Sequence, residues 1–321
     1  MKILFTWTGV TSYMADCWRA LQAAPDVELK VVVEQADSGK SFAAEKTLAG
    51  LDCLLVDGRS APGELEETLS AFAPDVVFAG GWRSPTTRRV LAQYRQVPRV
   101  FCLDMPWRWS LRCLVARFAL RPFLRQFNAV YVPGASAAFY AHWLGFPKGR
   151  IYRRLYAIDQ ARLRAAAPNG PRRGFLYVGR HSPEKRIDLI EKAYARYREL
   201  GGTWSVDSYG QGGKFVQADG MPQVYAEHAC LLLASSFDPW PLVMLEARAA
   251  GLEVIASDRC GNCDELGAFK VKYGDVGQMA RQMLAVERGA RNPAGGDLAS
   301  YDCPSWAVRT LEIAREVLAC R

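Results

Sequence analysis

The chain has 321 residues, of which half are hydrophobic and 11% are aromatic, so it can form two domains with buried cores and is not intrinsically disordered. No stretch of about 20 consecutive apolar residues occurs, which argues against a membrane-spanning helix. Nine cysteines without a secretion signal indicate reduced thiols, and we therefore expect a cytoplasmic protein. The net charge of +8 lies wholly in the first 168 residues. Between residues 83 and 164 there are sixteen basic residues and only two acidic ones, and this excess of positive charge favours an anionic partner.

Short apolar segments alternate with helical patterns through the amino-terminal half. A helix is predicted at residues 14–21, and strands are predicted at residues 2–7, 27–34, 51–57, 74–81, 99–104 and 128–134. Strands that alternate with helices indicate a parallel sheet with crossover connections.

A second strand and helix series follows residues 165–174, whose prolines and glycines are typical of a linker. Its strands are predicted at residues 174–179, 203–210, 230–236 and 253–258, with helices at 188–200 and from Pro241 onward. The sequence therefore predicts two doubly wound α/β domains, residues 1–168 and 169–303, and a closing helix at 304–321. We expect a ligand crevice where the carboxyl ends of the strands face each other.

The segment GRHSPEKR, Gly179 to Arg186, directly follows an apolar strand. Gly179 permits a tight turn, after which Arg180 and Lys185 can both point into the crevice beside the next helix. Two cations near a helix amino terminus suit a diphosphate. A solvated basic loop is the alternative.

The segment FDPWPLVMLEARAAG, Phe237 to Gly251, places two acids around the predicted start of a helix. Pro241 suits the first helical position, which leaves the amides of Leu242 and Val243 free to bind an anionic oxygen. Glu246 then lies about one and a half turns into the helix, while Asp238 precedes it in the loop. The alternative is a capping Asp238 and a surface Glu246.

Taken together, these motifs resemble glycosyltransferase family 4, the retaining GT-B enzymes with two Rossmann-like domains. The matching runs are YVGRHSPEK, YGQGG and SSFDPWPLVMLEARAAGLEVIASD, in the family's order and at roughly its spacing. RCGNCDELG resembles the family's Gly-rich loop, and PSWAVRTLEIA resembles its closing helix. The resemblance covers residues 174–321 well, is looser over 128–160, and is one of pattern in the first 127 residues.

The resemblance implies a role for each matching residue. Arg180 and Lys185 would hold the diphosphate of the donor. Asp238 would bind hydroxyls of the donor sugar, and Glu246 would bind the hydroxyls of the ribose. Backbone contacts to the donor would come from Gly179, Gly210, Gly212, Leu242 and Val243. No DxD motif occurs, which fits the metal-independent GT-B type. We therefore expect no metal and no cofactor, only a nucleotide-sugar substrate, a UDP- or GDP-sugar.

Three features of the sequence depart from the family pattern. The first acid is usually Glu, and Asp238 is one methylene shorter, which bears on the choice of sugar. Pro239 and Pro241 replace glycines. The amino-terminal glycine-rich loop is reduced to TWTGVTSY, and Asp104 stands where a His is often found. These departures concern the acceptor and sugar sides of the site.

Residues 105–127 combine basic and apolar side chains. Arg108, Arg112, Arg117, Arg121 and Arg125 recur at intervals of four or five, which places them on roughly one side of a helix that Pro122 should kink or split. A basic amphipathic helix that begins near Trp107 and Trp109 suits an anionic membrane surface. The alternative is a domain helix with a solvated arginine face. Nucleic acid is not expected, because no fold signature for it accompanies the charge.

The expected function is transfer of a sugar, with retained configuration, to a cell-envelope glycan or lipid-linked acceptor such as lipopolysaccharide or capsule. The amino-terminal domain would bind the acceptor, and the protein would lie in the cytoplasm, peripherally on the inner face of the membrane. A non-catalytic GT-B partner protein that binds a nucleotide or glycan and a GT-B sugar-nucleotide epimerase remain as alternatives.

Overall fold

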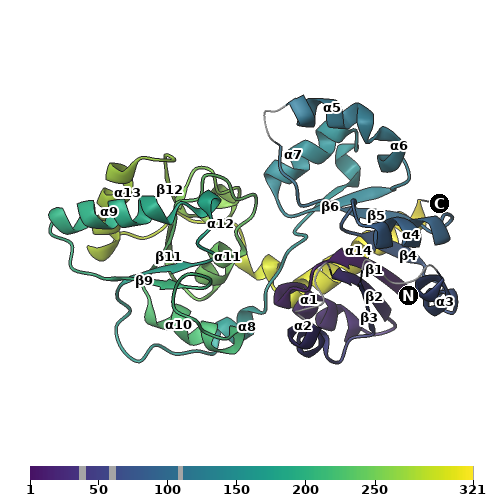
Figure 1. Ribbon diagram of the computed structural model, residues 1–321, viewed down its shortest axis with the longest axis horizontal. Coiled ribbons are helices and arrows are strands. Elements are labelled where there is room, and N and C mark those ends of the chain that lie inside the picture. Colours follow the sequence, from purple (N-terminus) through teal and green to yellow (C-terminus); the bar gives the residue numbers. More distant parts are fainter. Residues whose placement is uncertain (36–40, 58–62, 108–110, 321) are drawn as a thin grey trace. The chain divides into compact units, whose positions relative to one another are not determined.

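The computed structural model describes residues 1–35, 41–57, 63–107 and 111–320. The chain divides into two compact units, Met1–Ile158 with Ser300–Arg321, and Asp159–Ala299 (Figure 1). Each unit is an α/β structure with its own parallel sheet, as the sequence predicts. The expected domain boundary, between residues 168 and 169, lies within the second of these units.

The first unit is built on a seven-stranded sheet in the order β3-β2-β1-β4-β5-β6-β7, in which every strand pair is parallel. The strands are β1 (Lys2–Thr8), β2 (Glu28–Gln35), β3 (Cys53–Asp57), β4 (Val76–Ala79), β5 (Arg99–Cys102), β6 (Ala129–Val132) and β7 (Ile151–Arg153). The central strand β1 pairs Phe5 with Val31 on one side and with Phe78 on the other. Continuous apolar runs form these strands because helices cover both faces of a parallel sheet.

The helices of the first unit are α1 (Ser12–Gln22), α2 (Ser41–Leu48), α3 (Glu64–Ser70), α4 (Pro85–Gln93), α5 (Leu111–Ala119), α6 (Arg121–Leu124), α7 (Ala135–Leu144) and α14 (Cys303–Ala319). The predicted break at Pro122 is confirmed, since α5 ends before it and α6 carries it in its first turn. Arg108 and Trp109, which the sequence assigned to the same basic helix, lie outside the described residues.

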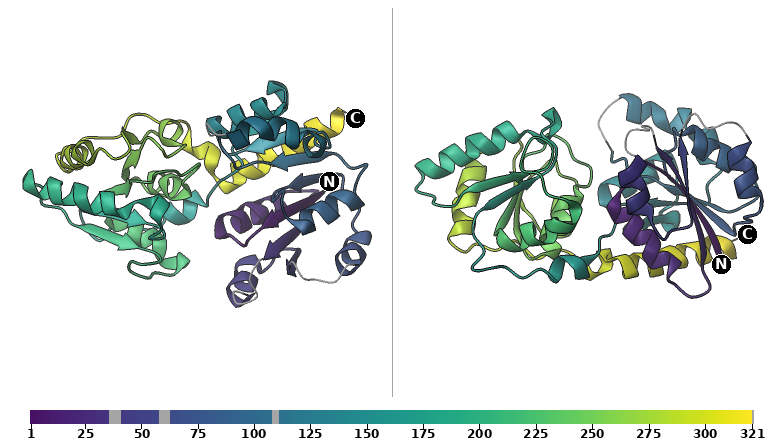
Figure 2. Two further views of the ribbon diagram at one scale, coloured as in Figure 1. Left: turned by 45° about the horizontal axis from the view of Figure 1, so that its top comes forward. Right: turned by 60° about the horizontal axis from the view of Figure 1, so that its bottom comes forward.

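The closing helix α14 packs along α1 within the first unit (Figure 2). Trp306 of α14 is buried and donates its indole N–H to the carbonyl of Leu155 at 2.7 Å. The Sγ atoms of Cys17 and Cys303 lie 3.9 Å apart in the same contact. The last helix in the sequence is thus part of the core of the first unit.

The second unit has a five-stranded parallel sheet in the order β12-β11-β10-β8-β9. Its strands are β8 (Phe175–Val178), β9 (Val206–Tyr209), β10 (Cys230–Leu233), β11 (Glu253–Ser257) and β12 (Phe269–Val271). The chain runs from β8 to β9 on one side and then returns to β10 on the other. The strand order therefore reverses between β8 and β10, and ligands of open α/β sheets bind at the carboxyl ends of the strands beside such a reversal.

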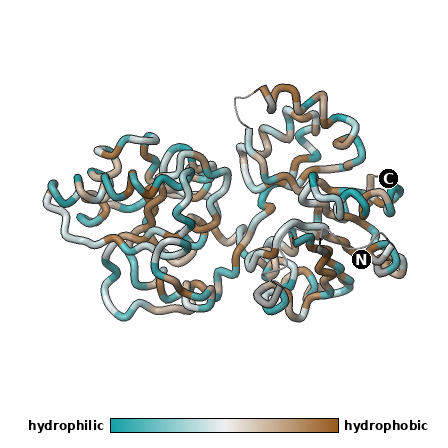
Figure 3. The backbone as a smooth tube through the Cα atoms, in the orientation of Figure 1, coloured by the Kyte–Doolittle hydropathy of each residue, from teal (hydrophilic) through white to brown (hydrophobic). Residues whose placement is uncertain are grey.

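The helices of the second unit are α8 (Gln160–Arg164), α9 (Ile187–Glu199), α10 (Met221–Glu227), α11 (Leu242–Ala249), α12 (Cys263–Leu266) and α13 (Val276–Glu287). Helices α9 and α13 pack on each other, and α8 packs on α10 and α11. Figure 3 shows the most hydrophobic segments along the inner strands of each unit, with hydrophilic residues on the outer loops.

Two strands are absent from the sequence prediction, β7 and β12. Each has three residues, which is too short to carry a recognisable period of apolar side chains. Each also occupies an edge of its sheet, where a strand needs a partner on one side only.

Candidate functional site

The loops that follow β8 and β9 are hydrogen-bonded to each other in the second unit. The amide of Gly179 donates to the carbonyl of Tyr209 at 3.0 Å, and the amide of His181 donates to the carbonyl of Gln211 at 2.9 Å. At Gly210 φ is +112°, and a Cβ there would lie 2.4 Å from the carbonyl oxygen of Gly179. Only glycine fits this approach. The pairing brings two of the predicted segments together.

Gly212 allows a second close approach between the same loops. Its φ is +96°, and a Cβ would lie 2.6 Å from the imidazole ring of His181. The Nε2 atom of His181 is also 2.9 Å from Oγ of Ser208. The ring of His181 is therefore packed against the β9 loop and fixes the path of the chain after Gly179.

Lys185 and Asp238 form the central ion pair of the candidate site. The two residues come from the loops after β8 and β10, on either side of the reversal in strand order. The Nζ of Lys185 lies 2.5 Å from Oδ2 of Asp238, with the two side chains 21% and 10% exposed. The amide of Ser236 joins the same loops by donating to the carbonyl of Glu184 at 2.8 Å. Asp238 is therefore an ion-pair partner, and the alternative of a capping aspartate does not apply, because α11 has no side-chain cap.

Arg180 differs from Lys185 in its exposure. Its side chain is 69% exposed and lies 3.8 Å from the carboxylate of Glu184, a separation at which a surface pair contributes little stability. The hydroxyl of Tyr177 donates to the carbonyl of Arg180 at 2.8 Å. The backbone of Arg180 is thus held in place while its guanidinium remains accessible to an anion.

A fourth loop, after β11, holds the segment that carries Asp238, a role that was not predicted from the sequence. The amide of Asp238 donates to the carbonyl of Arg259 at 3.1 Å, and the amide of Gly261 donates to the carbonyl of Asp238 at 2.9 Å. A Cβ at Gly261 would lie 2.2 Å from the carbonyl oxygen of Pro239. The side-chain amide of Asn262 donates to the carbonyl of Pro241 at 3.1 Å. The CGNC segment therefore supports the loop after β10 that carries Asp238.

Helix α11 begins at Leu242, and Pro241 is its N-cap residue rather than its first helical residue. This corrects the predicted start by one position. The first turn contains Leu242 and Val243. The first amide of this segment to donate to a carbonyl within it is that of Met244, which donates to Pro241 at 3.0 Å, so the amides of Leu242 and Val243 precede the first helical hydrogen bond. Such amides, at the positive end of the helix dipole, are suited to an anionic oxygen.

Glu246 lies on α11 and is partly buried against α10. The hydroxyl of Tyr225, on α10, donates to Oε2 of Glu246 at 2.5 Å. Burial raises the pKa of the Glu246 carboxyl, while the hydrogen bond from Tyr225 and the charge of Arg162 on α8 act in the opposite direction. Neither partner was predicted from the sequence, because neither lies near Glu246 in the chain.

The structure thus gathers Gly179, Arg180, Lys185, Gly210, Gly212 and Asp238 at the carboxyl ends of β8, β9 and β10, with Leu242 and Val243 at the start of the following helix. Glu246, further along α11, accepts a hydrogen bond from Tyr225 of α10. Among the residues that the structure describes, no cluster of metal-ligating side chains was found.

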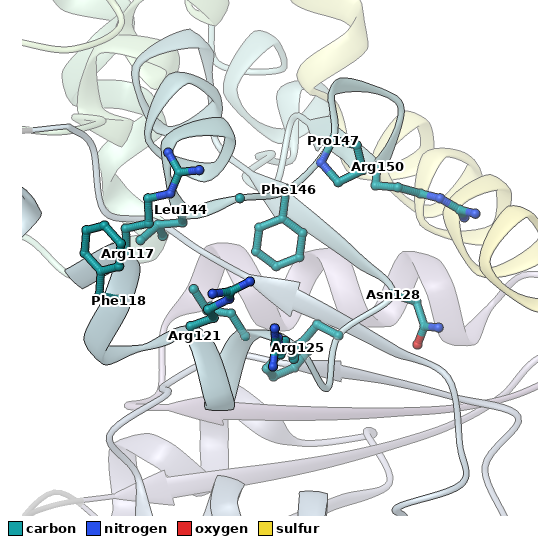
Figure 4. Close-up of a pocket in the computed structure, with 12 residues that line it drawn as sticks. Arg117, Phe118, Arg121, Arg125, Asn128, Leu144, Phe146, Pro147 and Arg150 are labelled. Carbon is teal, nitrogen blue, oxygen red and sulfur yellow. The ribbon is translucent and has the colours of Figure 1, made fainter. Parts of the chain in front are cut away.

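Cavities also lie among the described residues of the first unit. A polar cavity of about 450 Å³ and an apolar cavity of about 590 Å³ share Trp82, Arg83 and Leu103 in their walls. A third cavity, also about 590 Å³, is lined by four arginines and by no acid. Figure 4 shows Arg117, Arg121 and Arg125 of this pocket around Phe146, with Arg150 extending away from them.

Comparison with known proteins identifies a family over most of the second unit. Residues 172–288 match the family model described as glycosyl transferases group 1. The chain carries a group 1 glycosyltransferase domain. The matched range contains all nine predicted site residues. No significant match was found among curated proteins.

Solved structures show that the whole fold is of the GT-B type. HepE of Anabaena, solved with UDP and glucose, is similar with a TM-score of 0.69 and 15% identity over 100% of this chain and 99% of that one. The lipopolysaccharide outer core galactosyltransferase WaaB has a TM-score of 0.66 at 14% identity, covering 98% and 99%. A UDP-GlcNAc 2-epimerase from Methanocaldococcus jannaschii has a TM-score of 0.68 at 12% identity, covering 98% and 100%. Residues 172–288 thus form a group 1 glycosyl transferase domain in a chain with the GT-B fold.

No helix among the described residues is long and apolar enough to span a membrane.

Proposed function

We propose that this protein transfers a hexose, with retained configuration and without a metal ion, from a UDP- or GDP-sugar to a cell-envelope acceptor. The observation that carries the proposal is the Lys185–Asp238 pair at the strand-order reversal, beside Arg180 and the start of α11. Cations and free amides at this place would stabilise the charge that develops on the leaving diphosphate. Asp238 would take hydroxyls of the sugar, and Glu246 would take those of the ribose.

The chemistry needs no further base from the protein. The bond from the anomeric carbon to the diphosphate breaks, a bond to the acceptor oxygen forms on the same face, and the leaving diphosphate takes the acceptor's proton. The residues of this chain bind and orient the donor, hold its charge and exclude water. UDP-glucose is the first donor to test, because HepE, of similar fold, was solved in complex with it.

Donor binding is expected to raise thermal stability. A ligand that binds only the native state at 100 times its Kd stabilises that state by about 2.7 kcal/mol. Thermal shift across UDP-, GDP- and ADP-sugars should therefore single out one nucleotide, and transfer or slow donor hydrolysis should follow with it. A chain that bound a donor without transfer or hydrolysis would be a binding module, and one that bound none of these donors would contradict the proposal.

The epimerase remains a second candidate because a UDP-GlcNAc 2-epimerase shares the fold at nearly full coverage of both chains. An epimerase would convert the donor sugar with no acceptor present. Following the donor alone by proton NMR distinguishes the two, since a transferase leaves the configuration of the unreacted donor sugar unchanged.

Glu246 should show a trade-off between stability and donor affinity. Its pKa is raised in the folded protein, so the protonated carboxyl stabilises the fold below the unfolded pKa, and this contribution is lost as the pH rises through the folded pKa. At neutral pH, Glu246→Gln should therefore raise the Tm, and the gain should disappear below about pH 4. Loss of a charged hydrogen-bond partner should raise the donor KM at least about tenfold.

The matched control for Glu246 is Glu227→Gln, at an exposed position on α10. This variant should change neither the Tm nor the KM. An unchanged KM in Glu246→Gln would remove Glu246 from the ribose site. Differential scanning fluorimetry between pH 4 and 8 and initial-rate kinetics give the two readouts.

The surface around α5 supports the proposal that the protein lies peripherally on an anionic membrane. Leu111 is 79% exposed, Phe118 is 71% exposed and Val115 is 58% exposed. Arg117 and Arg121 lie beside them and line the arginine pocket (Figure 4). Apolar side chains next to arginines fit the boundary between headgroups and acyl chains. This binding would place the enzyme on the cytoplasmic face, and the first unit would bind the acceptor.

Sedimentation with phosphatidylglycerol-containing vesicles tests the membrane proposal. Each basic residue near an anionic surface contributes about 1 kcal/mol, so the double change Arg117→Gln with Arg121→Gln should weaken binding roughly 30-fold. The control pair, Arg88→Gln with Arg95→Gln, neutralises two arginines away from α5. Absence of binding by the intact protein, or an equal loss in both pairs, would refute the proposal.

A further inference from the structure

The polar and apolar cavities of the first unit adjoin each other at the carboxyl ends of its strands. Residues just after β1, β4 and β5 line the polar cavity, and Trp82, Arg83 and Leu103 belong to the walls of both. The two cavities therefore adjoin at these three residues.

The apolar cavity has the size and lining of a ligand site. Its volume of about 590 Å³ lies within the common range of small-molecule pockets, roughly 300–1,000 Å³. One wall is the face of α5 that carries Leu111, Val115 and Ala119 at helical spacing, and Phe101 and Phe123 lie opposite. Leu111 and Val115 are exposed, so the cavity opens at an apolar rim. Apolar surface held open in this way favours a hydrocarbon ligand.

The polar cavity offers hydrogen-bonding groups to a hydroxylated ligand. Its Glu34 is already engaged, since it accepts from Oγ of Ser84 at 2.6 Å and from the amide of Thr86 at 3.1 Å. Asp104 is exposed and accepts only one described hydrogen bond, from the hydroxyl of Tyr156 at 3.1 Å. A carboxylate has about four acceptor positions, so Asp104 retains acceptor capacity for ligand hydroxyls.

Arg83 stands where the two cavities meet. Its guanidinium lies 4.7 Å from the centre of the Trp82 ring, and its side chain is exposed, with no ion pair among the described residues. The guanidinium thus lies over the Trp82 ring, and its N–H groups make no ion pair among the described residues. A planar donor group held at the border of an apolar and a polar cavity suits a phosphate.

We propose that the two cavities bind one amphiphile: a hydrocarbon chain in the apolar cavity, a phosphate at Arg83 and a hydroxylated head beside Asp104. This inference rests on the proposed function, because it makes a lipid phosphate that carries a sugar the acceptor of that reaction. The acceptor hydroxyl forms the new bond to the anomeric carbon of the donor sugar, and its proton leaves on the donor diphosphate.

Isothermal titration calorimetry with hexyl, octyl and decyl phosphate, each below its critical micelle concentration, tests the assignment. A buried methylene contributes about 0.8 kcal/mol, so affinity should rise roughly tenfold for each pair of methylenes. Inorganic phosphate should bind weakly. A series without dependence on chain length would overturn the proposal.

Two variants of α5 separate the cavity from the exposed surface of the helix. Ala119→Trp fills the cavity mouth and should abolish the dependence on chain length, whereas Leu114→Trp, at an exposed position outside the cavity, should preserve it. If Ala119→Trp folds poorly, Leu111→Asn makes the same test at the rim. Dependence on chain length that survives in these variants would indicate adsorption to the surface and refute the site.

Arg83→Gln tests the phosphate position. It should weaken octyl phosphate binding roughly tenfold and leave octyl glucoside binding unchanged. An equal effect on both ligands, or none, would contradict the role of Arg83. None of these measurements needs a donor, so failure here is distinct from failure of the donor to raise the Tm or to react.

Discussion

Replacing Arg180 with Ala should lower the rate of sugar transfer by about 10²- to 10³-fold, the loss seen when one group that stabilises developing charge is removed. The guanidinium is 69% exposed and contacts only Glu184, at 3.8 Å, among the described side chains. Its removal should therefore leave the free energy of unfolding nearly unchanged. A large loss of rate without loss of stability would show that Arg180 acts on the substrate.

The matched control is Arg173→Ala, an exposed arginine that precedes β8 in the same unit. Both variants lose one positive charge, so a general effect of net charge on donor attraction would appear in both. The proposed role requires that the rate fall in Arg180→Ala alone, with kcat reduced more than the KM is raised. Near-native transfer by Arg180→Ala would show that the donor-site assignment is wrong.

The sequence predicted the fold well because the signals that define it are local. Short segments rich in apolar residues mark ten of the twelve strands, and Pro122 marks the break between α5 and α6. The glycines at 179, 210 and 212 could also be recognised as loop positions, because a loop residue that needs a positive φ is usually glycine. Strands of three residues carry no such pattern.

The contacts within the candidate site could not be predicted in the same way. Lys185 and Asp238 are 53 positions apart, and their contact depends on β8 and β10 being neighbours in the sheet. Tyr225 reaches Glu246 only because α10 and α11 pack near each other with particular faces inward. The contacts of Gly261 and Asn262 with the loop that carries Asp238 likewise depend on the position of β11 beside β10. Contacts between side chains of different elements can be predicted only when the order of the strands in the sheet is known.

The Lys185–Asp238 pair should respond differently to loss of either partner. Lys185→Ala leaves a largely buried carboxylate without its cation, which should cost up to about 3 kcal/mol in the free energy of unfolding. It should also lower transfer by at least about 10²-fold. The surface pair Lys270–Asp264, at 2.7 Å with side chains 44% and 82% exposed, is the matched control, and Lys270→Ala should change neither quantity.

Asp238→Asn separates the two proposed roles, because the donor diphosphate must compete with Asp238 for Lys185. Without the carboxylate, Lys185 is free, and one negative charge no longer repels the diphosphate. The affinity for UDP should therefore rise several-fold, by at least roughly 1 kcal/mol, the upper value for exposed charge pairs. Transfer should still fall by about 10²-fold, since the group that holds the sugar hydroxyls is altered.

Calorimetric titration with UDP and with UDP-glucose, together with rate measurements, tests whether UDP affinity rises while transfer slows. Asp264→Asn is the control. Tighter UDP binding with slower transfer means that Asp238 restrains the cation in the free enzyme and holds the sugar in the complex. Weaker binding of UDP itself would mean that the carboxylate is needed only to keep Lys185 in place. In that case the pair would be structural support, and the choice of sugar would have to depend on other residues.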